Sequence, residues 1–219
     1  MGACDHQRVY VPRANAMADA EVAAFLAAHP AGHLVTVRPD GRPDVTLLPV
    51  LVDEHEGASR VVGHLARANE HWRGIAPASP GVVVVTSADA YVSPGWYASK
   101  AEHGRVVPTW NYSEVQLRGA VTVRDDPDWV LDVVTRLTHR HGSRRERPWS
   151  VDDAPAKYVR GQLRAIVGIE LVVESVEGKA KLSQNRSDAD RRGVIAGLRA
   201  EGGPAAHRVA DEMERVLDG

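Results

Sequence analysis

The sequence predicts an α+β protein built on an antiparallel β-barrel. Three observations lead to this fold class. Strand-like segments come first and are joined by tight turns, of which Asp40-Gly41 is typical of a hairpin. Helical segments are inserted between the later strands, and no strand–helix–strand unit repeats along the chain. This order favours antiparallel pairing and a barrel over a parallel sheet wound with helices.

A helix over 19–29 is the first expected element, with Val22, Phe25 and Leu26 on one face and Pro30 just beyond its end. Runs of branched residues predict the strands that follow, and Asn69 is a good N-cap for a short helix. The predicted barrel strands are 34–37, 45–52, 61–65, 82–86, 117–123 and 167–176.

Helices dominate the second half of the chain. Asp128 opens a predicted helix over 128–141, and Gly142 ends it. Further helices are expected over 157–165, 187–200 and 205–217. We expect one domain over 1–219 that carries its C-terminal helices at about 187–219, because 219 residues suffice for a single sizeable core.

Composition excludes several classes of protein. Cys4 is the single cysteine, so neither an intrachain disulfide nor a cysteine zinc cluster is expected. The sequence shows no long apolar run and no signal-like segment, and we expect a cytoplasmic protein that does not enter a membrane. A net charge of −2 and the lack of a recognition helix predict no specific nucleic-acid partner.

Aromatic side chains gather in one window, 91–112. The chain has five Trp and one Phe, yet Trp96 and Trp110 both lie here with three tyrosines. Pro108 lacks an N–H, and we expect 107–112 to be a loop. Such a surface suits a flat conjugated ligand held by stacking and edge hydrogen bonds, and the alternative interpretation is an aromatic corner of the core.

Two polar segments could bind an anion. In 63–69 a predicted strand ends beside Arg67 and Asn69, whose side chains suit a phosphate or carboxylate together with free backbone N–H groups. The polar run 181–186 could hydrogen-bond a ligand or cap the helix that follows.

Two histidines on neighbouring predicted strands are candidate metal ligands. His64 could bind a metal or an iron porphyrin, or it could be a partly buried strand residue satisfied by a carbonyl, and His33 carries the same alternatives. The sequence contains no HExxH motif, nucleophile elbow, P-loop or Rossmann glycine pattern. Nothing therefore supports catalysis by an unaided protein nucleophile.

Five separated segments, in the family's order, resemble the PaiB family. They are 63–69 (GHLARAN), 90–93 (AYVS), 107–112 (VPTWNY), 166–168 (IVG) and 181–186 (KLSQNR). PaiB proteins are called FMN-binding negative transcriptional regulators and have the FMN-binding split-barrel fold. The resemblance implies a homodimer in which each chain forms a six-stranded antiparallel split β-barrel with peripheral helices. It also implies cofactor sites at the dimer interface.

The chain departs from the family's pattern at three histidines. Leu47 replaces the histidine of the family's Thr-His-Leu-Pro segment. Asp89 replaces the histidine of Gly-Pro-His-Ala-Tyr, and Gln116 replaces the histidine of Asn-Tyr-x-x-Val-His. His33 appears where the family usually has Thr. These changes predict a pocket with a rebuilt polar lining. The chain thus resembles the piperazate synthases, which look like PaiB proteins but use haem to close N-hydroxyornithine into a cyclic hydrazine.

This resemblance predicts a haem-dependent biosynthetic enzyme that forms an N–N bond and makes piperazate. The alternatives are an FMN-binding negative transcriptional regulator and a flavin-dependent oxidoreductase on the same fold. Haem b is the expected cofactor and FMN the alternative. Trp110 and Asn111 would shape the cavity and orient the amino-acid substrate.

The cofactor is expected to rest on residues of the two polar segments. Arg67 and Asn69 would hold its anionic part, which is a propionate of haem or the phosphate of FMN. Gln184 and Arg186 are further candidates for the same pocket. The predicted iron ligand is His64, with His33 as the second choice.

Overall fold

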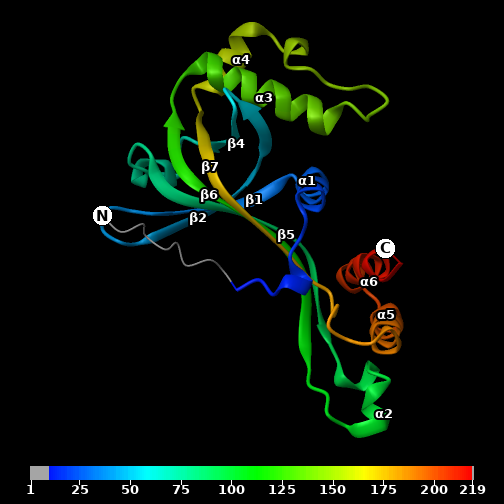
Figure 1. Ribbon diagram of the computed structural model, residues 1–219. Helices are drawn as coiled ribbons and strands as arrows, with labels where there is room; N and C mark the ends of the chain where they lie inside the picture. The colour runs from blue at the N-terminus through cyan, green and yellow to red at the C-terminus, as the bar shows by residue number, and fades with distance from the viewer. Residues whose placement is uncertain (1–9, 219) are drawn as a thin grey trace. The chain divides into compact units, whose positions relative to one another are not determined.

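The computed structural model describes residues 10–218 and contains seven strands in one sheet (Figure 1). The strand order is β2-β1-β5-β6-β7-β4-β3. Strand β1 pairs antiparallel with β2 and β5, and β4 pairs antiparallel with β3 and β7. The strands are β1 (Ala31–Val37), β2 (Pro43–Pro49), β3 (Leu51–His55), β4 (Ala58–Ala66), β5 (Ser79–Val92), β6 (Thr109–Arg124) and β7 (Ile166–Lys181). The predicted α+β class with a curled antiparallel sheet is confirmed.

The expectation of six strands is wrong by one, because 45–52 forms two strands. Strand β2 ends at Pro49, which has no N–H to continue the ladder. The backbone N–H of the next residue, Val50, donates to the carbonyl of Pro30 at 2.8 Å. Leu51 then begins β3, which pairs with β4 rather than with β1.

The prediction of a loop over 107–112 is also wrong from Thr109 onward, because strand β6 begins at that residue. Asn111 and Ser113 occupy the buried face of this strand, which continues through Val115 and Leu117. These two polar residues interrupt the apolar alternation that marks a half-buried strand, so its first part could not be recognised by hydropathy.

The helices lie close to their predicted positions. The described helices are α1 (Asp19–Ala28), α2 (Ser99–His103), α3 (Pro127–Gly142), α4 (Ala156–Leu163), α5 (Asp188–Glu201) and α6 (Pro204–Asp218). The short helix after Asn69 is a 3-10 turn over Glu70–Gly74, and the Asn69 side chain caps it as expected. Within 10–218 no helix is long and apolar enough to cross a bilayer.

The contacts divide the chain into two compact units. Unit 1 comprises the residues up to Phe25 with Thr86–Val115 and Glu177–Gly219, and unit 2 comprises Leu26–Val85 with Gln116–Val176. In unit 2, helix α3 packs on β4 through a small core. That core consists of Leu51, Val62, Val133 and Leu137, with Trp129 at its edge.

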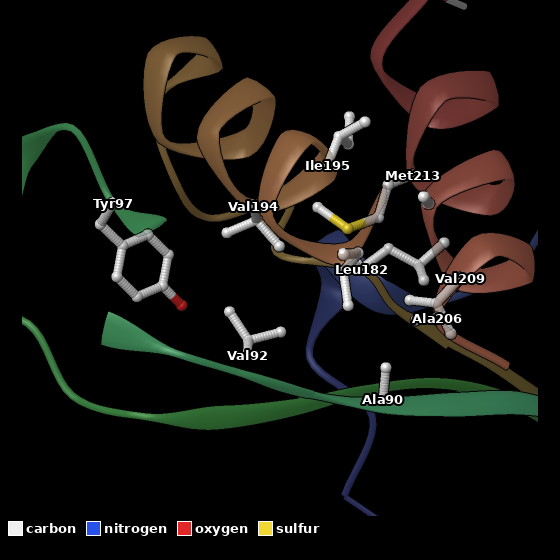
Figure 2. Close-up of a cluster of buried hydrophobic side chains, with 11 residues drawn as sticks. Ala90, Val92, Tyr97, Leu182, Val194, Ile195, Ala206, Val209 and Met213 are labelled. Atoms are coloured by element: carbon white, nitrogen blue, oxygen red, sulfur yellow. The ribbon is translucent and has the colours of Figure 1, made fainter. Parts of the chain in front are cut away.

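The core of unit 1 lies where α5 and α6 pack on the ends of β5 and β7. Figure 2 shows Val92 of β5 and Leu182 after β7 facing Val194 of α5 and Met213 of α6. All four side chains are at most 2 % exposed, so this cluster removes substantial apolar surface from water. It fixes the segment that follows β7, which carries the polar run 181–186.

Candidate functional site

A polar hollow of about 370 Å³ lies in unit 1, beside the end of β7 and the start of β6. It falls within the size range of small-molecule sites. Its lining consists of Tyr10, Pro12, Ala14, Asn15, Tyr97, Val107, Pro108, Thr109, Asn111, Lys181, Ser183, Asn185 and Arg186.

Arg186 lines this hollow with a guanidinium that has open hydrogen-bond donors. Its guanidinium carbon lies 4.8 Å from the centre of the Tyr97 ring, a cation–π contact that orients the group. Within the described part of the chain, the half-buried Arg186 side chain makes no hydrogen bond, and its charge contributes to lowering the pKa of the buried Asp190 carboxylate. A guanidinium with free donors is the group that best recognises phosphate or carboxylate oxygens.

Lys181 supplies a second positive charge to the hollow. Its Nζ donates to Thr109 Oγ1 at 2.6 Å and to the Trp110 carbonyl at 2.8 Å. These two hydrogen bonds fix the ammonium group beside the first residues of β6. Burial lowers the pKa of Lys181, and the neighbouring charge of Lys179 lowers it further. An anion bound beside Lys181 would oppose both effects.

Asn111 forms part of the floor of the hollow and is fully buried. Its amide Nδ2 lies 3.1 Å from Ser183 Oγ and 3.3 Å from Met213 Sδ, and the Ser183 hydroxyl lies 3.2 Å from its Oδ1. Ser183 has a φ of 65°, a left-handed conformation that is uncommon for serine. The pair therefore locks a strained turn at the base of the hollow.

Trp110 and Gln184 take other roles. Trp110 points away from Asn111, is 48 % exposed, and donates from Nε1 to Asp89 at 2.9 Å. Gln184 braces the turn after β7, because its Oε1 accepts from the Leu182 N–H at 2.7 Å and its Nε2 donates to Ala180. Neither side chain lines the hollow.

The other predicted anchors, Arg67 and Asn69, lie in unit 2 and have partners there. Arg67 donates to both carboxylate oxygens of Asp125, and this hydrogen bonding raises the pKa of Arg67. Asn69 accepts from the His71 N–H at 3.0 Å and donates to Thr46 Oγ1 at 3.2 Å. Their donors are already engaged, whereas those of Arg186 are open.

The two candidate iron ligands differ in burial. His64 is half-buried. Its Nδ1 is inaccessible to solvent and has no hydrogen-bond partner among the described residues. Burial lowers the pKa of His64, so its imidazole is neutral at physiological pH. His33 is exposed on β1, opposite Leu47 of β2. Among residues 10–218 no three His, Cys, Asp or Glu side chains are placed to hold a metal ion together.

The structure thus brings Asn111 and Arg186 to one hollow and adds Lys181, which the sequence offered only as part of a polar run. A lysine in a short polar segment has no local mark that distinguishes a ligand-binding role from a solvated one. Its contact with Thr109 joins residues 72 positions apart, and that pairing shows its place.

A family model described as "Putative FMN-binding domain" matches residues 9–175. The chain belongs to this FMN-binding family. A relative, "Protease synthase and sporulation protein PAI 2" of Bacillus subtilis (strain 168), is 30 % identical over 210 residues. That alignment covers 95 % of this chain and 98 % of PAI 2, so it includes the polar run 181–186. The resemblance to PaiB proteins is confirmed at the level of the family.

Solved structures show the same fold. A conserved hypothetical protein from Mycobacterium tuberculosis aligns with a TM-score of 0.56 and 16 % identity, over 81 % of this chain and 92 % of that one. A protein from Mycobacterium smegmatis described as "FAD and Heme binding" aligns with a TM-score of 0.55 and 19 % identity, over 88 % of this chain and 82 % of that one. These neighbours share the split-barrel fold of this chain.

Proposed function

We propose that this protein binds FMN and that the hollow of unit 1 holds the phosphate end of the cofactor. Membership of the FMN-binding family supports the choice of cofactor. The observation that carries the placement is Arg186, whose guanidinium lines a hollow and has no acceptor within the described chain.

The residues of the hollow fit a phosphate monoester. Such a group carries a charge of about −1.5 to −2 at neutral pH and presents three acceptor oxygens. Arg186 and Lys181 together supply two positive charges, and the Thr109 hydroxyl and Asn185 amide supply neutral donors. Arg67, the anchor expected from sequence, would have to exchange Asp125 for the phosphate.

FMN supplies reversible hydride and single-electron transfer when it is bound. The chain's own residues bind and orient it in this proposal. Arg186 and Lys181 hold the charged end, while the Asn111–Ser183 pair keeps the turn beneath them rigid. This division of roles suits both an FMN-binding regulator and a flavin-dependent oxidoreductase.

Titration with FMN, followed by quenching of flavin fluorescence, tests the proposal. We expect Arg186→Gln to raise the Kd for FMN about tenfold or more, because it removes a charged hydrogen bond. Arg192→Gln is the matched control, since Arg192 is exposed on α5 and does not line the hollow. An unchanged Kd in a folded Arg186→Gln variant, or a wild-type protein that binds no FMN, would reject the assignment.

The haem-dependent N–N bond-forming cyclase is a second candidate, and His64 favours it. A neutral imidazole is the form that binds iron, and His64 would bind it through Nε2 because its Nδ1 is inaccessible; one neighbour of the same fold is described as an FAD and heme binding protein. The absorbance spectrum of the purified protein separates the candidates, because haem gives a Soret band and FMN gives two flavin bands. A protein without a Soret band, or a His64→Ala variant with a wild-type haem spectrum, would contradict this role.

A further inference from the structure

A second hollow, of about 350 Å³, lies in unit 2 between the start of α3 and helix α4. Its lining consists of Arg67, Asp125, Asp126, Pro127, Val130, Arg160, Leu163, Arg164 and Ile166. We propose that this hollow binds a small amphipathic monoanion, namely a carboxylate attached to an apolar chain or ring. The inference is independent of FMN binding, which uses residues of unit 1.

Two arginines give the hollow its open positive charge. Arg160 lies in α4 and Arg164 caps its C-terminal end, so they are four residues apart and lie on one side of the helix. Both are exposed, and neither side chain makes a hydrogen bond or ion pair with another residue of the described chain. Two guanidinium groups with free donors on one rim can hold the oxygens of a single carboxylate.

The remaining charged side chains of the hollow are already satisfied. Arg67 is paired with Asp125, and its Nε donates to the Arg164 carbonyl at 3.0 Å. Asp126 caps α3 by accepting from the Asp128 and Trp129 N–H groups. The free charge of Arg160 and Arg164 is therefore the part that a ligand would neutralise.

The charge balance favours a monoanion over a phosphate dianion. Three arginines and two aspartates line the hollow, which leaves a net charge of +1. One carboxylate brings this value to zero. A dianion would add excess negative charge beside Asp125 and Asp126, where like charges repel.

The floor accommodates an apolar body. Val130 of α3 and Leu163 of α4 form it together with Pro127 and Ile166. Burial of a short hydrocarbon chain against such side chains is favourable at about 25 cal/mol per Å².

Calorimetric titration of the full chain with octanoate tests the proposal, with 1-octanol and inorganic phosphate as comparison probes. We expect saturable octanoate binding, which the double variant Arg160→Gln/Arg164→Gln weakens about tenfold or more. Octanol should bind more weakly because it lacks the charge. Arg145→Gln is the matched control, because Arg145 is exposed in the same unit and outside the hollow.

Two further measurements distinguish octanoate binding at this hollow from binding at the FMN site and from nonspecific apolar adsorption. Leu163→Asn should weaken octanoate without changing the Kd for FMN. Equal binding of octanol and octanoate, wild-type affinity in a folded double arginine variant, or tighter binding of inorganic phosphate than of octanoate would each overturn the assignment.

Discussion

Gly197 shows how one missing side chain sets the packing of unit 1. A Cβ at this position of α5 would lie 2.2 Å from the Trp96 ring, far inside contact distance. We expect Gly197→Ala to lower the free energy of unfolding by about 1–3 kcal/mol, because the indole must move. Gly161→Ala is the control, since it meets open space and should gain about 0.5–1 kcal/mol. Urea unfolding measures both, and a stabilised Gly197→Ala variant would contradict the prediction.

Residue chemistry predicted which side chains could bind an anion but not which of them were free. The segment 63–69 correctly marked a cation and a cap, yet Arg67 finds Asp125 58 positions away. A pairing over that distance leaves no local pattern in the sequence. For Arg186 the sequence leaves a ligand-binding role and a helix-capping role open, and its contact with Tyr97, 89 positions away, is likewise not visible locally.

A network of charged side chains joins several elements of unit 2. Arg60 of β4 donates to Asp53 of β3 at 2.6 Å and to Glu170 of β7 at 3.0 Å. Arg136 of α3 also pairs with Asp53, and Arg124 of β6 donates to Glu170 at 2.8 Å. Removing one partner from such a network leaves the others without compensation.

Asp53 makes the stability of this unit depend on pH. Burial alone would raise the pKa of Asp53, but hydrogen bonds from Arg60 and Arg136 outweigh burial and lower it below the ordinary value of 3.8. The carboxylate therefore stabilises the native state fully at neutral pH, and this contribution is lost as the pH falls through 3.8 and the lower native pKa.

Asp53→Asn should accordingly flatten the acid limb of the stability curve and lower stability at pH 7 by about 1.5–3 kcal/mol. Asp132→Asn is the control, because that carboxylate pairs with the same Arg136 yet is 61 % exposed. Unfolding at a series of pH values between about 3 and 7 measures both. An Asp53→Asn protein with the wild-type pH profile would show that the pairing adds nothing.

At the scale of elements, local signals served helices better than strands. Asn69 caps its 3-10 turn as expected, whereas α3 is capped by Asp126, two residues before the expected start at Asp128. Both caps accept from N–H groups two or three positions away, so the signal for a helix start is local. Strand β6 was recognised only in its apolar part, because Asn111 and Ser113 are satisfied by Ser183 and Glu212 from distant segments. The division of 45–52 depended on Pro49, whose effect on pairing requires knowledge of the neighbouring strand.

At the scale of the whole molecule, strands β1 and β2 carry apolar residues on both faces. Leu34 and Leu48 are buried, whereas Val37, Val45 and Leu47 are 53 %, 59 % and 60 % exposed. Strands that are apolar on both sides are typical of sheets covered on both sides. Among the described residues, none buries the face that carries Val37, Val45 and Leu47. This face is therefore a candidate surface for the expected homodimer.

We propose that a second copy of the chain packs on this face, through Val45 and Leu47 of β2. Leu47→Arg should convert a dimer at micromolar concentration into a monomer, because a charge in the centre of an apolar interface lacks a partner. Val52→Arg is the control, since Val52 is 41 % exposed but lies on β3, at the opposite end of the strand order. Sedimentation equilibrium distinguishes the outcomes. A monomeric wild type, or a Leu47→Arg variant that remains as dimeric as Val52→Arg, would leave the face without this role.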